Sequence, residues 1–419
     1  MQTNLSPEFK GTPDGDAAEA ILRKCVHCGF CTATCPTYQL LGDELDGPRG
    51  RIYLIKEVLE GAAPTRKTQS HLDRCLTCRN CETTCPSGVQ YGNLVEIGRR
   101  IVDKKVERPR GEQAVRWLLK EGLTSPLFDP AMKLGQLVRP LLPASLKSKV
   151  AAKPSAAEQA LAHRWPQRER PRKVLMLMGC VQQTMLPNIN SATARVLDAA
   201  GIQTVVAEEA GCCGAIRSHL GDHEGGLADM RRNIDAWWPS VLANKVEAIV
   251  MNASGCGATV KEYGHALARD KAYADKARRI SELTKDLSEL LPELVPALKS
   301  RMHRKPTARL AFHPPCTLQH AQQLRGGVET HLGLLGFDVQ LSPSESHLCC
   351  GSAGTYSVLQ PTLAYQLRDR KLANLAEVGA QTIVSANVGC IQHLQSGTTS
   401  PVKHWVEVLD EALQGTAPV

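Results

Sequence analysis

The 16 cysteines of this 419-residue chain are its most constraining feature, because two internal repeats account for all of them. The first repeat is a C-x2-C-x2-C-x3-C-P run that recurs after 50 residues. Its members are Cys25, Cys28, Cys31, Cys35 and Pro36, and then Cys75, Cys78, Cys81, Cys85 and Pro86. Cysteines scattered through a core for packing would not share such a spacing, so the pattern indicates metal or redox chemistry.

The spacing within each run is that of bacterial ferredoxins with two [4Fe–4S] clusters. Three cysteines at intervals of three residues wrap one face of a cubane, and the fourth starts a helix that points toward the other cluster. The ligand sets are therefore expected to cross over between the runs. We predict cluster 1 on Cys25, Cys28, Cys31 and Cys85, and cluster 2 on Cys75, Cys78, Cys81 and Cys35. Zinc is the alternative, but zinc favours separated C-x2-C pairs, so the runs favour cubanes.

The second repeat spans the C-terminal part of the chain. Cys180, Cys212, Cys213 and Cys256 recur 134 to 137 residues later as Cys316, Cys349, Cys350 and Cys390. Apolar runs precede these cysteines, as in RKVLMLMGC and ARLAFHPPC, and helical stretches separate the runs. Alternating strands and helices predict parallel α/β units. Since the carboxyl ends of parallel strands meet at one edge, four thiols should converge in each half.

These patterns predict an α+β multidomain chain. A helical two-[4Fe–4S] ferredoxin-like domain is expected over 1–107, with an amphipathic helix from about Arg51. A helical segment and linker follow over 108–172, and then two tandem α/β cysteine-rich domains over 173–304 and 305–419. The apolar run from Leu134 to Leu146 is interpreted as a helix packed on its own domain, with contact to a membrane or a partner as the alternative.

Composition and charge restrict the location and the partners. The N-terminus lacks the apolar region of a secretion signal, and no stretch approaches the roughly 20 apolar residues that span a bilayer. We expect a cytoplasmic protein, with peripheral attachment to the inner face of the membrane as an option. The net charge of +8 is spread over mixed acids and bases, without the aromatic-interleaved basic patch of nucleic-acid binding, so nucleic acid is not an expected partner.

A vicinal Cys-Cys-Gly marks each cysteine-rich half. Two adjacent thiolates can bind neighbouring irons, and glycine lets the backbone approach a bulky ligand. The candidate third site is Cys180, Cys212, Cys213 and Cys256, and the candidate fourth site is Cys316, Cys349, Cys350 and Cys390. Four interpretations of these cysteines remain: a further iron–sulfur cluster, a zinc ion, a metal-free redox dithiol, or plain core cysteines. A cluster in at least one half is favoured.

Several segments together resemble the iron–sulfur subunit of bacterial glycolate oxidase, from about residue 18 to residue 410. They are HCGFCTATCPTYQLLGDELDGPRGRI, CLTCRNCETTCPSG, AGCCGA, ASGCGA, HPPCTLQHA, HLCCGSAGTY and ANVGCIQHL. The resemblance implies a complex whose FAD-carrying subunits oxidise glycolate to glyoxylate, while this subunit passes the electrons to a quinone. A related D- or L-lactate dehydrogenase complex is the alternative. No nucleophile–base pair and no GxGxxG stretch stands out, so no hydroxyacid chemistry is expected in this chain alone.

The C-terminal halves also resemble the Cys-Cys-Gly domains of heterodisulfide reductase. That resemblance implies a noncubane cluster on five cysteines, of which the last two form a CxxC. This chain has Ala253 and Asn387 where the CxxC would begin, so each half offers four thiols. A cubane, a zinc ion or a cluster completed by another ligand remains, and His313, His347 and His393 lie nearby in sequence. The missing cysteine counts against a catalytic disulfide reductase. The second half is the expected exit toward the quinone.

Overall fold

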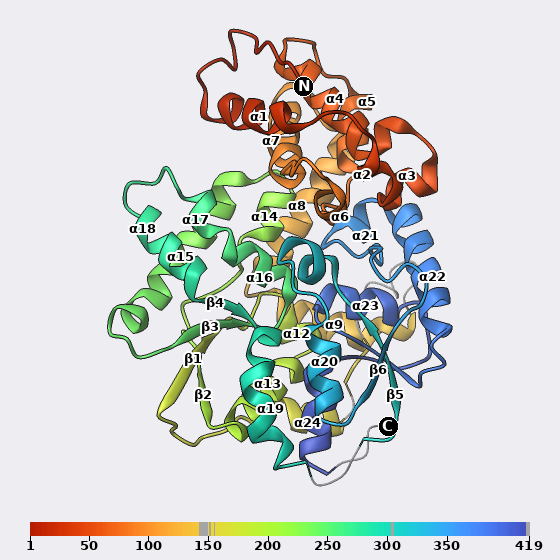
Figure 1. The fold of residues 1–419 in the computed structure, drawn as a ribbon. Coiled ribbons are helices and arrows are strands. Elements are labelled where there is room, and N and C mark those ends of the chain that lie inside the picture. Colours follow the sequence, from red (N-terminus) through yellow and green to blue (C-terminus); the bar gives the residue numbers. More distant parts are fainter. Residues whose placement is uncertain (142–149, 151, 155, 303–305, 416–419) are drawn as a thin grey trace.

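Helices form the regular structure of the described residues before 172, and two parallel sheets with their helices build the part from there on (Figure 1). The structure is a computed structural model that describes residues 1–141, 150, 152–154, 156–302 and 306–415. The predicted combination of a helical domain and two α/β domains is confirmed.

In the N-terminal domain, short helical turns lie between longer helices. They are α1 (Pro13–Lys24), α2 (Phe30–Ala33), α3 (Pro36–Leu41), η1 (Glu44–Asp46), α4 (Pro48–Leu59), α5 (Arg66–Asp73), α6 (Asn80–Thr84) and α7 (Tyr91–Lys105). Helix α4 begins at Pro48, three residues before the predicted start, because proline suits the first turn of a helix. Gly50 is needed there, since a Cβ would lie 2.2 Å from the carbonyl oxygen of Glu44.

Each C-terminal half contains a four-stranded parallel sheet, in the orders β2-β1-β3-β4 and β6-β5-β7-β8. The first sheet consists of β1 (Arg172–Met176), β2 (Ile202–Val205), β3 (Ala248–Met251) and β4 (Thr284–Asp286). The second consists of β5 (Arg309–His313), β6 (Asp338–Leu341), β7 (Thr382–Ser385) and β8 (Val402–His404). The first three strands of each sheet fall within the predicted apolar runs. The three-residue edge strands β4 and β8 are too short to give such a run.

The helices of the two halves cover these sheets. In the first half they are α12 (Gln182–Met185), α13 (Asn188–Ala199), α14 (Ala215–His219), α15 (His223–Leu242), α16 (Ser254–Lys261), α17 (Tyr263–Ala266), α18 (Ala274–Leu283), η3 (Leu287–Leu290) and α19 (Leu291–Lys299). In the second half they are η4 (Thr317–Ala321), α20 (Gly327–Leu334), α21 (Tyr356–Leu359), α22 (Pro361–Ala376), α23 (Val388–Gln395) and α24 (Trp405–Leu413). The halves share one apolar core, in which Val174 and Leu291 belong to the same cluster as Leu310 and Trp405.

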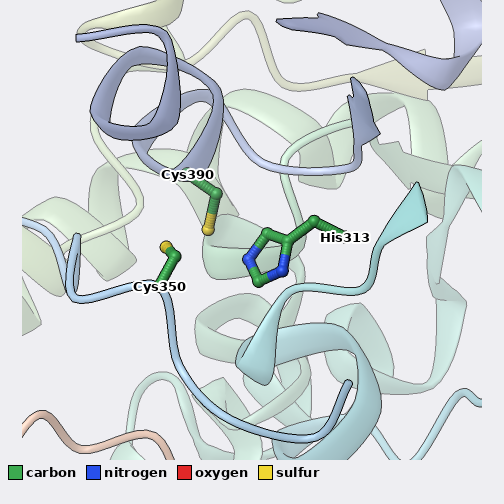
Figure 2. A group of neighbouring side chains, drawn as sticks. All are labelled: His313, Cys350 and Cys390. Atoms are coloured by element: carbon green, nitrogen blue, oxygen red, sulfur yellow. The ribbon is translucent and has the colours of Figure 1, made fainter. Parts of the chain in front are cut away.

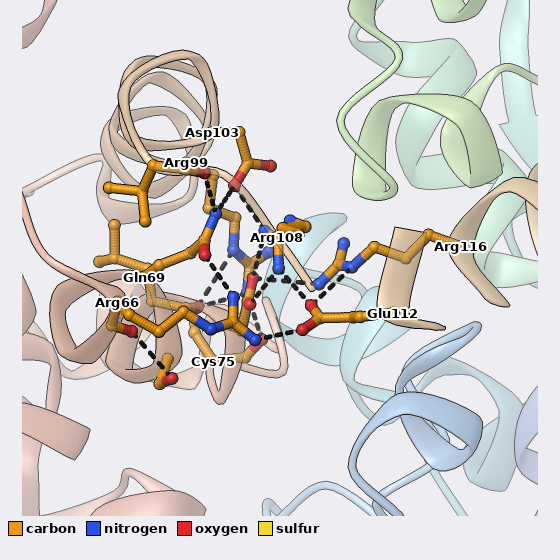
Figure 3. A network of polar contacts seen from close by, with 12 residues as sticks. Arg66, Gln69, Cys75, Arg99, Asp103, Arg108, Glu112 and Arg116 are labelled. Carbon is orange, nitrogen blue, oxygen red and sulfur yellow. Dashed lines mark hydrogen bonds and ion pairs between the residues drawn. The ribbon is translucent and has the colours of Figure 1, made fainter. Parts of the chain in front are cut away.

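The segment between the two parts consists of α8 (Arg110–Thr124), α9 (Phe128–Val138), η2 (Arg139–Leu141) and α11 (Ala156–Ala162). Its start is attached to the N-terminal domain, because Arg108 donates to both carboxylate oxygens of Asp73 at 2.6 and 3.0 Å. Figure 3 shows Arg108 within a polar network that includes Asp103 and Glu112. The C-terminal part of α8 reaches the first half, where Arg217 pairs with Glu121 at 2.9 Å.

Leucine side chains of α9 and of the turn η2 after it are exposed and not packed on the domain. Leu134, Leu137 and Leu141 are 62%, 69% and 86% exposed, so the favoured interpretation of the run is wrong for these residues. Residues 142–146 of the run lie outside the described part of the chain. Within the described part, no helix combines the length and the apolar character needed to cross a bilayer.

Candidate metal centres

The first cavity of the N-terminal domain is lined by cysteines from both runs. Cys25, Cys28 and Cys31 lie in the loop and turn after α1, and Cys81 and Cys85 reach the same space from α6 and its C-terminal end. The cavity, together with its opening to solvent, has a volume of about 430 Å³ not filled by protein atoms. Burial and the nearby sulfurs, Cys25 first, raise the pKa of Cys31 to about 11. A neutral thiol is thus favoured until a metal ion replaces its proton, so the donor set fits a thiolate-ligated cluster.

The second cavity is lined by Cys35, Cys75, Cys78 and Cys81. The structure therefore brings the fourth cysteine of each run to the first three of the other run, which is the arrangement that crossed ligand sets need. Cys81 lines both cavities and lies between them.

A buried arginine accompanies the second cavity. Arg51 is only 1% exposed and donates to Asp46 at 3.4 Å. Burial acts to raise the pKa of the Cys75 thiol, but Arg51 and Arg99 together lower it. A buried cation beside these sulfurs suits the net negative charge of a thiolate-ligated cluster. The sequence-based prediction did not include Arg51. The available signal was its position on the apolar face of α4, where it shares a face with Ile55 and Val58.

The two cysteine runs contact each other and have similar backbone conformations. Thr34 and Thr84, which are 50 residues apart, are hydrogen-bonded through their hydroxyl groups at 3.1 Å. His27 and Thr77 occupy equivalent places and both have positive φ angles, 57° and 52°. In the second loop this conformation lets the backbone N–H of Thr77 donate to the sulfur of Cys75 at 3.4 Å. The loop backbone thus turns a donor toward a sulfur, as a charged cluster requires.

In the first cysteine-rich half, four thiols lie in a row at the ends of β1, β2 and β3. Cys180 is within hydrogen-bonding reach of Cys212, Cys212 of Cys213, and Cys213 of Cys256. Hydrogen bonds from Cys180 and Cys213 and from backbone amides lower the pKa of Cys212. The backbone of the vicinal pair is fixed by Asn233, whose side-chain amide donates to the carbonyl of Cys212 at 2.8 Å.

The second half repeats this row with deeper burial. Cys316, Cys349, Cys350 and Cys390 are all buried, and each lies within hydrogen-bonding reach of the next. Lys371 is 2% exposed, and this burial lowers its pKa. The nearby thiols of Cys316 and Cys350 partly offset the lowering.

The glycine after each vicinal pair has a different task from the one expected. Gly214 and Gly351 have φ angles of 93° and 88°, and a Cβ on them would lie 2.7 and 2.4 Å from helix carbonyl oxygens. These carbonyls belong to Gly226 on α15 and Ala364 on α22. The glycine thus allows close packing against a helix backbone. Asn233 and Lys371 each lie seven residues beyond these carbonyls, so a neutral amide in the first half corresponds to a buried cation in the second.

The three histidines named near the second row have different surroundings. Figure 2 shows His313 facing Cys350 and Cys390, and the ligand atoms of the three residues lie within 4.8 Å of one another. His393 donates from Nε2 to the carbonyl of Ala364 at 3.1 Å. His347 contributes its carbonyl oxygen, which accepts from His320 at 2.9 Å. The structure therefore brings His313 to the thiols.

The N-terminal domain docks directly onto the second row. Leu76 and Cys78 belong to the same apolar cluster as Cys316 and Cys349, and after burial itself Cys316 is the strongest influence raising the pKa of Cys78. Side-chain hydrogen bonds fix this contact, among them the following two. Tyr356 donates to the carbonyl of Arg74 at 3.1 Å. Thr83 bonds to Nδ1 of His320, in the π-helical turn η4, at 2.9 Å.

Known families and proteins match both parts of the chain. A 4Fe-4S dicluster domain model matches residues 21–89, and a cysteine-rich domain model matches 174–261 and 310–395. The glycolate oxidase iron-sulfur subunit of Escherichia coli K12 is 55% identical over 416 residues, which cover 99% of this chain and 100% of that protein.

More distant relatives match as well. A probable glycolate oxidase iron-sulfur subunit of Bacillus subtilis is 32% identical, over 94% of this chain and 92% of that protein. The lactate utilization protein A of Bacillus pumilus is 26% identical over 53% of this chain and 90% of that protein. The chain therefore belongs to the family of glycolate oxidase iron–sulfur subunits.

Proposed function

We propose that this chain is the electron-transfer subunit of a flavin-dependent glycolate oxidase complex, which oxidises glycolate to glyoxylate and delivers the electrons to a quinone. The observation that carries the proposal is the line of sulfur sites. The cavity of Cys25, Cys28, Cys31 and Cys85 adjoins that of Cys75, Cys78, Cys81 and Cys35, and Cys78 in turn adjoins Cys316 and Cys349.

These cysteines divide into proposed ligand sets. Cluster 1 is held by Cys25, Cys28, Cys31 and Cys85, and cluster 2 by Cys75, Cys78, Cys81 and Cys35. When bound, such clusters accept and release single electrons. The proposed domains are 1–107, 173–304 and 305–419, with 108–172 joining them.

Electrons are proposed to enter at cluster 1. Cys28 is exposed, and its neighbours Val26 and Phe30 are apolar side chains with exposed fractions of 68% and 61%. An exposed apolar rim beside a cluster suits the docking of a flavoprotein subunit. The FAD of that subunit takes the hydride from glycolate, which is chemistry that flavins supply.

Electrons are proposed to leave near the second cysteine-rich half, which adjoins cluster 2. A catalytic disulfide reductase is less well supported, because the vicinal pair Cys349–Cys350 is at most 6% exposed and gives a disulfide substrate no access. A lactate complex has weaker support, since the lactate utilization proteins match little more than half of this chain.

Because the proposed acceptor is a quinone, the complex is expected to work at a membrane. We propose peripheral contact with the cytoplasmic face, made by exposed apolar side chains of α8, α9 and the turns beside them. These side chains are Trp117, Leu118, Leu127, Leu134, Leu137 and Leu141.

The test uses the complete complex with a Cys349→Ser/Cys350→Ser variant. Glycolate oxidation with an artificial dye that accepts electrons upstream should persist, and glycolate-dependent quinone reduction should fall at least tenfold. The matched control is Cys212→Ser/Cys213→Ser, which changes the equivalent pair of the first half, away from Cys78. Full quinone reduction by a correctly assembled Cys349→Ser/Cys350→Ser complex would remove this half from the electron path.

A further inference from the structure

His313, the last residue of β5, has an imidazole enclosed by the second cysteine row. It is 0% exposed, and neither ring nitrogen has a hydrogen-bond partner among the described residues. Buried polar atoms are nearly always paired, so an imidazole with both nitrogens unpaired indicates a partner of another kind. The sulfurs of Cys350 and Cys390 are the ligand atoms that lie within 4.8 Å of its ring nitrogen (Figure 2).

Other buried histidines of the chain use their ring nitrogens differently. His320 bonds Thr83 through Nδ1 and the carbonyl of His347 through Nε2. His404 is as deeply buried as His313, but its Nδ1 accepts the backbone N–H of Val406 at 3.1 Å and caps α24. His313 is thus not a core histidine held by ordinary hydrogen bonds.

The position where a fifth cysteine would stand is occupied by Asn387, which has other tasks. Its side-chain amide donates to the sulfur of Cys390 at 3.6 Å, and its oxygen accepts the N–H of Gly255 in the first half at 3.3 Å. Asn387 therefore orients a thiol and ties the halves together, and the place of a fifth ligand is left to another side chain.

The first half lacks a counterpart of His313. In the first sheet Val174 of β1 pairs with Ala248 of β3, and in the second sheet Leu310 of β5 pairs with Thr382 of β7. Val174 and Leu310 therefore hold equivalent places in the two sheets. Three residues further along, Leu177 is the equivalent of His313. Both rows therefore contain four thiols, but the strand β5 places an imidazole beside the second row, and the equivalent strand β1 places a leucine beside the first.

We propose that His313 is the fifth protein ligand of an iron–sulfur cluster held by Cys316, Cys349, Cys350 and Cys390, and that the first half holds its centre with four thiolates alone. The proposal rests on the proposed electron-transfer function and names the ligand set of its last centre. Compared with a cluster held by five thiolates, a cluster with an imidazole as its fifth ligand carries one negative charge fewer, which raises its reduction potential, as histidine ligation does in other iron–sulfur centres. A raised potential suits a centre that receives electrons from cluster 2.

The experiment is pulsed electron–nuclear double resonance on the complete complex, purified anaerobically from cells supplied with ¹⁵N-histidine and reduced with dithionite. A directly bound imidazole gives a strong ¹⁵N coupling in the spectrum. We expect this coupling in the unaltered complex and its loss in His313→Leu, which installs the residue of the first half. The matched control is His404→Asn, which removes another buried imidazole and keeps a helix-capping side chain, so the coupling should persist.

A second variant guards against misfolding. His313→Cys offers a thiolate at the same place, so it should retain the iron content of the unaltered complex and lose the ¹⁵N coupling. The proposal is overturned by absence of the coupling in the unaltered complex, by its persistence in His313→Leu, or by zinc in place of iron at this row. Because dithionite supplies the electrons, failure of glycolate-driven quinone reduction would count against the proposed function and leave this result standing.

Discussion

Individual buried charges distinguish sulfur sites that otherwise look alike. Arg51 lies beside the thiols of the second N-terminal cavity, and Lys371 lies beside those of the second cysteine-rich half. The equivalent of Lys371 in the first half is Asn233, which is neutral. A buried cation stabilises the more negative, reduced form of a cluster, so Arg51, and Lys371 in its protonated form, favour electron uptake at neighbouring points of the proposed route.

The proposed crossing of the ligand sets gives a prediction for a single thiol. Cys35→Ser should impair the cluster of Cys75, Cys78 and Cys81, because the sulfur of Cys35 lines their cavity and not that of its own run. Anaerobic iron analysis with electron paramagnetic resonance should show this cluster altered and the other unchanged.

Cys85→Ser is the mirror-image control and should spare the cluster of the second run. Damage confined to the cluster of Cys25, Cys28 and Cys31 in the Cys35→Ser protein would show that the sets do not cross.

Elements with a strong local pattern were predictable from the sequence, and elements defined by tertiary contacts were not. The apolar runs that end in cysteines are strands, and the rows of thiols lie beyond their carboxyl ends. The edge strands β4 and β8 carry three residues each, too few for a periodic pattern. His313 could only be named together with His347 and His393, because the choice depends on which ring the end of β5 directs at the sulfurs. Lys371 lies in the middle of α22, where nothing local predicts its burial.

The exposed apolar face of α9 gives a prediction at this scale. Leu134→Glu/Leu137→Glu should reduce binding of the complex to vesicles of anionic phospholipid at least threefold, because two carboxylates replace apolar groups on the proposed membrane face. Co-sedimentation measures the bound fraction.

Leu242→Glu is the matched control, since Leu242 is also 70% exposed but lies at the end of α15. Equal vesicle binding by the α9 variant and the unaltered complex would exclude this face as the membrane contact.

The whole molecule is held together around its sulfur sites. The N-terminal domain bonds to the second half through Tyr356 and His320, and to the first half through an ion pair between Arg79 and Glu262. Both halves therefore keep fixed places relative to the two N-terminal cavities. Such an arrangement suits a relay, in which the distance between centres has to stay constant.

A relay has no activity of its own toward the substrate. The purified chain, free of flavoprotein, should show no glycolate-dependent reduction of its clusters, because hydride removal requires the flavin of a partner. Addition of the flavoprotein subunits should restore cluster reduction, followed as bleaching of visible absorption.

Dithionite supplies the control, since it should bleach the isolated chain directly. Glycolate-dependent bleaching of the flavin-free chain would contradict the assignment of the chain as a relay.

The contact between Cys78 and the thiols of Cys316 and Cys349 also constrains how the protein matures. In the finished fold the N-terminal domain covers the second row, and none of its four sulfur-bearing residues is more than 7% exposed. A scaffold protein that delivers iron and sulfide needs direct access to the recipient thiols. Insertion of the proposed centre at the second row would therefore have to precede closure of the N-terminal domain over it, and repair of that centre after oxidative damage would require the two parts to separate again.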